Sequence, residues 1–304
     1  MAAYVTLGLL SLLWGTSFLL IKIASAAFAP LAFALARVSV AAVAMLAASA
    51  LMRQRWPGWR PGLWATLAGL ALVGQVIPFL LLGVAARMTT SADMALMMGA
   101  SPIFVFVAGR FIGAGDRWTL PGALGLTVGF AGVGLALWAP GAHAAAALPQ
   151  AALGRVFALV ATFCYALSTI LSGAATREIG AVRAVTASMT LSSLSLGLVG
   201  LAVGGSGLAD TVLTSPARPL LAMAALGVFN TALAYYVYFR LVAAEGPTFA
   251  SLNNYIVPVI GVIGGGFALR EPVAGSAWAG LALVLAGVAL TGRAVRPAPR
   301  AGAR

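Results

Sequence analysis

Long apolar runs dominate this chain and decide which solvent it can fold in. Ten runs of about 20 mostly apolar residues follow one another, joined by short connections. At about 1.5 Å per residue, a helix of that length crosses the hydrocarbon core of a bilayer. The predicted membrane-spanning helices are roughly 4–24, 30–52, 62–86, 90–111, 119–139, 154–175, 182–203, 219–242, 248–268 and 275–292.

The composition excludes most other classes of protein. Of the 304 residues, 62% are hydrophobic and only 8% are charged, which is too little polar surface for a soluble domain. The net charge of +12 does not indicate a nucleic-acid partner, because the arginines fall in connections and no patch of basic and aromatic residues accompanies them. A single cysteine, Cys164, and a single histidine, His143, leave little for a metal site or a hydrolytic triad. We therefore expect membrane lipid as the surroundings, no catalytic residues, no metal, no cofactor and no enzymatic activity.

The second half of the chain repeats the first. The acidic residues Asp116 and Glu271 each precede a similar block at the same distance. Because each copy holds five predicted spans, an odd number, the second copy must enter the membrane upside down relative to the first. The predicted fold is therefore all-α, with ten transmembrane helices in two inverted-topology repeats. The matching blocks, 155 residues apart, are Gly125-Leu126 with Ala131-Gly132-Val133 and Gly280-Leu281 with Ala286-Gly287-Val288.

The repeat also predicts the organisation of the chain. Residues 1–140 form the first repeat, 141–153 a linker rich in Ala, Pro and Gly, 154–292 the second repeat, and 293–304 a basic tail. Ala24-Ser25-Ala26 resembles the cleavage site of a signal peptide. However, no Lys or Arg precedes the first apolar run, and cleavage would leave nine spans. We expect the first helix to be retained.

The basic residues predict the orientation in the membrane. Twelve arginines fall in connections on one side, counting the tail, and four fall on the other. By the positive-inside rule this bias places both termini in the cytoplasm, with the chain integral to a bacterial-type inner membrane. The twelve are Arg53, Arg55, Arg60, Arg110, Arg117, Arg177, Arg183, Arg240, Arg293, Arg296, Arg300 and Arg304; the four are Arg87, Arg155, Arg218 and Arg270.

Several local motifs add a family resemblance to the repeat. They are Trp14-Gly15-Thr16-Ser17-Phe18, Pro102, Pro258, and Glu271-Pro272 followed by the second Gly- and Ala-rich block. With ten spans, the chain resembles the drug/metabolite transporter superfamily, EamA-type, over nearly its whole length. Within that superfamily it looks most like the YddG-like aromatic amino-acid exporters. The first half departs from the pattern at Gly115-Asp116-Arg117, where a Glu-Pro is expected, so this position is interpreted as orienting a helix.

The resemblance implies export of a small molecule by alternating access. Amino acids, especially aromatic or large apolar ones, are the expected substrates, and drugs and nucleosides remain alternatives. A non-transporting membrane scaffold is a more remote alternative. The Gly- and Ala-rich fifth and tenth spans indicate a close-packed pair, at the rim or at a dimer contact, so a monomer and a homodimer both remain open.

Two buried amides are candidates for contact with the substrate. Gln75 lies in the third predicted span and Asn230 in the eighth, and the 155-residue offset maps one onto the other. Since polar side chains in hydrocarbon are costly, the pair could face each other and bind the polar end of a zwitterion. The alternative is ordinary hydrogen bonding between helices.

Prolines mark places where spans are interrupted. Pro258 follows Asn253 and Asn254 in the ninth span, and a proline removes the hydrogen bond to the carbonyl four residues earlier. A freed carbonyl is tolerated where it lines a cavity. Adjacent helical residues point in different directions, so one asparagine is expected to line the site while the other packs. Pro78 and Pro102 interrupt the third and fourth spans similarly, and each of the three is also interpretable as a simple kink.

Aromatic residues could form a box around the amides. Phe79 lies one turn beyond Gln75, Trp14 and Tyr165 occupy similar places in the first and sixth spans, and Tyr238 lies two turns from Asn230. Such a box would suit an aromatic or apolar substrate. The alternative for each ring is packing or contact with lipid.

Charged residues within spans are few. Lys22 and Arg37 could each hold a substrate carboxylate, although snorkelling or structural pairing is the favoured interpretation. No carboxylate occupies the middle of a span, and Asp93 lies near the start of the fourth. A proton relay usually needs such a group, so we expect facilitated or weakly coupled transport.

Overall fold

The computed structural model describes residues 2–101, 104–105, 107–108, 120–138, 150–251, 253–268 and 275–294. All regular elements within these residues are helical, as the sequence predicts. Two of them, η1 (Leu72–Val76) and η3 (Val228–Leu233), are π-helical. The α-helices are α1 (Ala2–Ser25), α2 (Pro30–Leu51), α3 (Pro61–Ala71), α4 (Ile77–Met88), α5 (Ser91–Met98), α7 (Leu120–Trp138), α8 (Ala151–Ile179), α9 (Ala181–Ala202), α10 (Leu208–Thr214), α11 (Ala217–Gly227), α12 (Ala234–Ser251), α13 (Asn253–Ala268) and α14 (Gly275–Ala294).

Seven helices of the described residues are long and apolar enough to cross a membrane. They coincide with seven of the ten predicted spans, and α7 and α14 lie within or over two more. Of the predicted fourth span, the structure describes α5 and a few residues after it. The seven are Ala3–Ser25, Pro30–Leu51, Pro61–Met88, Ala151–Ile179, Ala181–Ala202, Ala217–Gly246 and Phe249–Ala268.

The boundaries differ from the predicted ones around the linker. Helix α8 begins at Ala151, inside the stretch predicted as linker, and continues to Ile179, beyond the predicted end at 175. Apolar Ala151 and Ala152 extend the helix, because nothing in them terminates it. The remainder of the linker, with His143, lies outside the described residues, as do Pro102, Asp116, Glu271 and most of the basic tail.

The third and eighth spans are each interrupted by a π-helical segment, which their apolar runs did not indicate. Helices α3 and α4 are joined through η1, and α11 and α12 are joined through η3. A π turn inserts one residue and redirects the side chains beyond it. The break between the eighth and ninth spans falls at Gly246, whose φ of 86° and ψ of 164° suit glycine alone.

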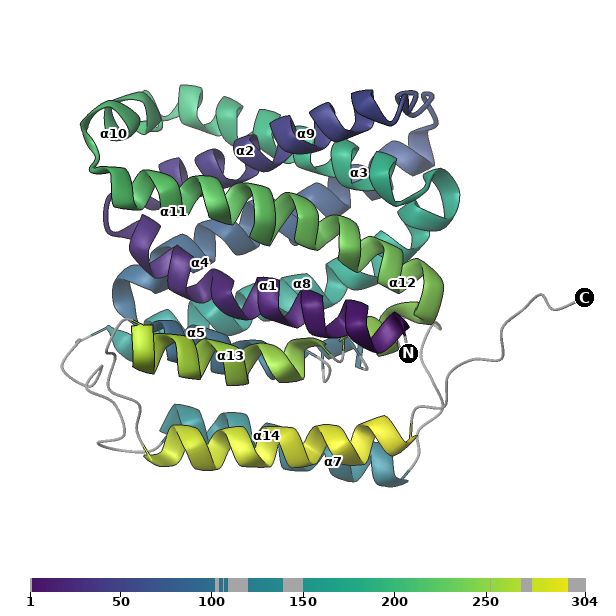
Figure 1. The fold of residues 1–304 in the computed structure, drawn as a ribbon, viewed down its shortest axis with the longest axis vertical. Helices are drawn as coiled ribbons and strands as arrows, with labels where there is room; N and C mark the ends of the chain where they lie inside the picture. The colour runs from purple at the N-terminus through teal and green to yellow at the C-terminus, as the bar shows by residue number, and fades with distance from the viewer. Residues whose placement is uncertain are drawn as a thin grey trace, which may run out of the picture.

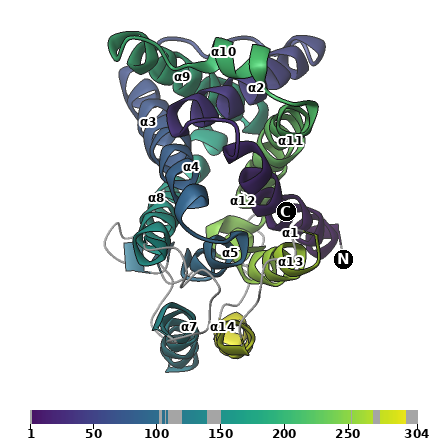
Figure 2. The same ribbon diagram turned by 90° about the vertical axis from the view of Figure 1, so that its left-hand side faces the viewer.

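Most of the helices form one bundle, and α7 and α14 form a pair beside it (Figures 1 and 2). Helix α1 packs on α13 and on α11 and α12, while α8 packs on α4, α3 and α5. Helix α2 lies along α9, and α5 lies along α13. The pair meets the bundle mainly through α5 and α13.

Glycine brings α7 and α14 into backbone contact. A Cβ atom placed on Gly287 would lie 2.5 Å from the Gly125 carbonyl oxygen and 2.5 Å from the Gly129 nitrogen. Only a residue without a side chain permits this approach, which is how small residues let membrane helices pack closely. The structure therefore confirms the expectation that these two Gly- and Ala-rich helices form a close-packed pair.

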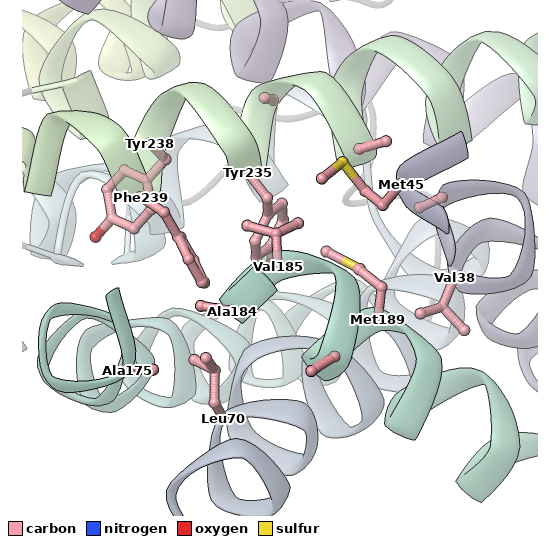
Figure 3. Close-up of a cluster of buried hydrophobic side chains, with 14 of the residues drawn as sticks. Val38, Met45, Leu70, Ala175, Ala184, Val185, Met189, Tyr235, Tyr238 and Phe239 are labelled. Carbon is pink, nitrogen blue, oxygen red and sulfur yellow. The ribbon is translucent and has the colours of Figure 1, made fainter. Parts of the chain in front are cut away.

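Two buried clusters of apolar side chains hold the bundle together. The first gathers side chains of α1, α2, α4 and α5, and includes Phe28 and Phe33. Figure 3 shows the second, in which Tyr235 and Phe239 of α12 lie beside Val185 and Ala184 of α9. Trp14 of α1 and Tyr165 of α8 pack against both clusters. The space between the clusters is therefore bordered by these two aromatic side chains.

Candidate functional site

A central cavity lies between the two apolar clusters. It offers about 580 Å³ of space between its lining atoms, counted to its open mouth. Side chains of α1, α2, α4, α5, α8, α12 and α13 contribute, so both halves of the chain line it. The lining residues are Trp14, Ser17, Phe18, Ile21, Arg37, Leu82, Met98, Ser101, Tyr165, Ser168, Thr169, Tyr235, Tyr238, Asn254 and Val257.

Aromatic rings form one wall of the cavity. The Trp14 ring lies 4.9 Å from that of Tyr238 and 5.7 Å from that of Tyr235, measured between ring centroids. The Tyr238 hydroxyl is fixed by a hydrogen bond of 2.6 Å with the Thr169 hydroxyl. Packed rings with fixed hydroxyls present a rigid surface that suits a flat or apolar group of a ligand.

Pro78 explains how Tyr235 is held. A proline has no backbone N–H, so the carbonyl four residues earlier, that of Gly74, loses its usual helical partner. The hydroxyl of Tyr235, on α12, donates to this Gly74 oxygen of η1 at 2.7 Å. A carbonyl of the third span, left without its helical partner by Pro78, thus accepts a hydrogen bond from the eighth span beside the cavity.

Arg37 brings a positive charge to the cavity wall. Its side chain is only 3% exposed, and its Nε donates to the Thr231 hydroxyl at 2.9 Å. The guanidinium carbon lies 3.9 Å from the centroid of the Phe79 ring, a cation–π contact. Its Nη1 has no hydrogen-bond partner among the described residues. Of the two interpretations favoured from the sequence, snorkelling does not fit this buried group, whereas structural pairing fits its contacts with Thr231 and Phe79.

The two asparagines of α13 have different surroundings. Asn254 lines the cavity, and its Nδ2 donates to the Ser101 hydroxyl at 3.0 Å, while its Oδ1 lacks a partner among the described residues. Asn253 is fully buried away from the cavity lining, and neither polar atom of its side chain has a partner within the described residues. Pro258 is buried one turn beyond them, within α13.

The structure does not place Gln75 and Asn230 among the cavity-lining residues. Gln75 is fully buried, and its Oε1 accepts from the Ser192 hydroxyl of α9 at 3.1 Å. The Asn230 Nδ2 donates to the Leu13 carbonyl and, at 3.0 Å, to the Thr16 hydroxyl, both of α1. Their hydrogen bonds thus join different helices. These bonds fit the alternative interpretation of the two amides, which is ordinary hydrogen bonding between helices.

The other predicted residues divide between the cavity and its support. Trp14, Tyr165 and Tyr238 line the cavity, whereas Phe79 is fully buried beneath the guanidinium of Arg37. Lys22 lies at the end of α1, where its Nζ donates to the Ala86 and Thr89 carbonyls, both at 2.7 Å. These carbonyls belong to the end of α4, so Lys22 ties two helices together.

Sequence reasoning gave too little weight to Arg37 and passed over the hydroxyls of Ser17, Ser168 and Thr169. The sequence held one signal for Arg37. No acidic residue stands three or four positions from it along α2, so a partner on the same helix is excluded. The hydroxyls gave no signal, because serine and threonine also bond to their own helix, as Ser168 and Thr169 do to the Tyr165 carbonyl at 2.9 Å.

The part of the chain that the structure describes holds no cluster of side chains suited to binding a metal ion. No group of three or more His, Cys, Asp or Glu side chains occurs there. Cys164 is a buried free thiol on α8. The carboxylates of Asp93, Glu178, Asp210 and Glu245 are all absent from the cavity lining.

A bundle of membrane-length helices around a partly polar central cavity defines an integral membrane protein of the transporter class. The sequence profile of the EamA-like transporter family matches residues 1–138 and 152–293. The chain therefore belongs to the EamA-like transporter family, within the drug/metabolite transporter superfamily.

Individual relatives agree with this family. The uncharacterized inner membrane transporter YedA of Escherichia coli K12 is 25% identical over 296 residues, which cover 92% of this chain and 87% of YedA. An uncharacterized transporter of Archaeoglobus fulgidus is 25% identical over 297 residues, covering 95% and 96% of the two chains. One protein of known crystal structure is similar in fold, with a TM-score of 0.65 and 18% identity over 95% of this chain and 96% of that one.

Proposed function

We propose that this protein carries a small amphipathic solute across the membrane through the central cavity, by alternating access. The observation that carries the proposal is the cavity itself. Both halves of the chain line it, and it combines aromatic rings, hydroxyls, an amide and one cation. A site formed between two related halves can open to either side as the halves rock against each other.

We propose further that the fold consists of ten spans in two inverted repeats. The contacts between helices support this arrangement: α1 packs on α11 and α12 as α8 packs on α3 and α4. Corresponding helices also pair directly, α2 with α9 and α7 with α14. The Ser39 and Ser193 hydroxyls, 154 positions apart, share a hydrogen bond of 2.8 Å, as expected near a two-fold axis. The family profile matches once in each half, at 1–138 and 152–293.

An inner-membrane location with both termini cytoplasmic fits the same picture. The beginning of α1 and the end of α14 lie on the same side of the bundle, at the right in Figure 1. An even number of crossings gives this result. The bias of arginines toward that side supports its assignment to the cytoplasm.

The proposed substrates are amino acids with aromatic or large apolar side chains, exported as by the YddG-like proteins that the sequence resembles. The wall formed by Trp14, Tyr235 and Tyr238 suits such a side chain, because offset and edge-to-face ring contacts are favourable. The hydroxyls of Ser17 and Thr169 offer polar contacts in the same cavity.

Transport is proposed to be facilitated or only weakly coupled. Among the described residues no carboxylate lines the cavity, whereas proton-driven carriers usually place one on the substrate path. Asp93 is buried on α5, where its Oδ2 accepts from the Thr89 hydroxyl at 2.5 Å. A proton gradient that drives uphill accumulation in proteoliposomes would contradict this part of the proposal.

A flux screen in proteoliposomes tests the proposed substrate class. Purified protein is reconstituted, and counterflow of labelled L-phenylalanine, L-leucine, uridine and a lipophilic cation is measured. We expect amino-acid flux that falls strongly in Trp14→Ala but not in Trp59→Ala, since Trp59 is 78% exposed and stacks on Trp64 away from the cavity. Flux of uridine or the cation, with none of either amino acid, would overturn the substrate class. Absence of flux for all four would favour a membrane scaffold.

A further inference from the structure

We infer that Arg37 and Asn254 form a two-part site for a zwitterion, in which Arg37 binds the carboxylate of the solute and Asn254 accepts from its ammonium group. The inference rests on the proposed transport function and extends it to the chemistry of recognition. Both residues line the central cavity, and each has one buried polar atom without a partner among the described residues. One of these atoms is a donor and the other is an acceptor.

The charge of Arg37 is buried in the protein interior. Arg37 makes no ion pair with a carboxylate of the described residues, and its electrostatic neighbours are the phenol groups of Tyr165 and Tyr235. Burying an unpaired cation costs several kcal/mol in a low-dielectric interior. In membrane helices, such residues mark substrate paths. A carboxylate arriving with the solute would supply the missing negative charge.

The guanidinium is held in place before any ligand arrives. Its Nε is fixed on the Thr231 hydroxyl, which in turn donates to the Leu226 carbonyl at 2.7 Å. Its planar face rests on the Phe79 ring. Neither contact uses Nη1, so little side-chain entropy is lost when an anion binds there.

Asn254 is positioned in a similar way. Its Nδ2 donates to the Ser101 hydroxyl, which fixes the amide plane and leaves Oδ1 as an acceptor without a partner among the described residues. An ammonium group has three donors and no acceptor, so it matches this oxygen. A neutral amide suits a substrate that must leave again, because a carboxylate at this place would bind the ammonium more tightly.

Other ligands fit this pair less well. A lipophilic cation would be repelled by Arg37, and Arg37 is the only Lys or Arg among the lining residues described. A phosphate group usually needs several cationic donors. A nucleoside has no charge to offset that of the guanidinium. The combination therefore favours a solute with one carboxylate and one amine.

Three ligands with the same ring test the two contacts separately. L-Phenylalanine carries both groups, 3-phenylpropionate only the carboxylate, and phenethylamine only the ammonium. Dissociation constants are measured by titration of the purified protein in detergent. We expect the wild type to bind L-phenylalanine most tightly and phenethylamine most weakly. Equal affinity for L-phenylalanine and phenethylamine in the wild type would overturn the role of Arg37 without any variant, and so would a wild type that binds none of the three.

Variants give the second readout. Arg37→Gln should weaken both carboxylates about 10- to 100-fold, because it removes a charge-assisted hydrogen bond, and should strengthen phenethylamine binding, because it removes a charge that repels the ammonium. Asn254→Ala should weaken L-phenylalanine and phenethylamine but not 3-phenylpropionate. Arg87→Gln is the control, because Arg87 donates to the Ser25 carbonyl outside the cavity lining. A merely structural Arg37 would weaken all three ligands alike, which would overturn the inference.

The test also separates this inference from the proposed function. If 3-phenylpropionate binds in an Arg37-dependent manner while no amino acid is transported, the carboxylate site stands and the proposed substrate class fails. If L-phenylalanine is transported by the wild type and its affinity is unchanged in Arg37→Gln, the substrate class stands and the inference fails.

Discussion

Replacing Gly287 by alanine should force α7 and α14 apart. The added Cβ would lie 2.5 Å from two backbone atoms and 2.7 Å from a third, the Gly129 Cα. Ordinary contact between such atoms needs about 3.5 Å, so the helices must separate by roughly 1 Å. Because the opposing atoms are backbone, no side-chain rotation can relieve the overlap. Overpacking of this kind costs about 1–3 kcal/mol.

Thermal unfolding in detergent measures this cost. For chains of a few hundred residues, each kcal/mol lowers the melting temperature by roughly 2–4 °C, so we expect a decrease of about 2–12 °C. Gly134→Ala on α7 is the matched control, since its Cβ would meet no atom within 4 Å. The control should melt at the wild-type temperature or slightly above it, because alanine favours helix over glycine.

The same pair of variants also separates packing from transport. Neither α7 nor α14 contributes a lining residue to the central cavity. Ligand affinity below the melting temperature should therefore be the same in Gly287→Ala and the wild type. Equal melting of Gly287→Ala and Gly134→Ala would refute the close backbone contact as a source of stability.

Three further substitutions test individual contacts. Ser192→Ala removes the donor to the Gln75 Oε1 and should lower the free energy of unfolding by about 1–2 kcal/mol. The melting temperature measures this loss, and an unchanged melting temperature would contradict a structural role for this bond. Lys22→Met leaves the carbonyls at the end of α4 without their cation and should destabilise the protein by a similar amount, whereas a stabilised variant would contradict that role. Tyr238→Phe loses the hydrogen bond with Thr169 but keeps the ring against Trp14. Titration should therefore show less than a tenfold loss of affinity for L-phenylalanine. A larger loss than in Trp14→Ala would count against the ring as the main contact.

The candidate site was only partly predictable from the sequence. Trp14, Tyr165, Tyr238 and Asn254 were predicted and line the cavity. The aromatic residues were predicted from their places in the repeat and relative to Asn230, and Asn254 from the proline that follows it. Arg37 was set aside because snorkelling is the usual behaviour of a basic residue near a helix end. Only its burial against Phe79 and Thr231 shows that it does not reach the membrane surface.

The sequence by itself determined the solvent, the all-helical class and the positions of most spans. These properties follow from the length and polarity of local runs, because every backbone polar group in a bilayer must be satisfied within its own helix. The Gly-rich blocks also predicted the close pairing of α7 and α14, since small residues are what backbone contact requires.

The tertiary structure alone decided which polar side chains face the cavity. A constant offset between repeats paired Gln75 with Asn230, but Gln75 in η1 bonds to α9 and Asn230 in η3 bonds to α1. An inserted residue rotates all later side chains about the helix axis, and apolar periodicity does not reveal it in a run that is apolar on every face. Whether a polar atom is free or partnered depends on residues far along the chain, as with Arg37 and Thr231, which lie 194 positions apart.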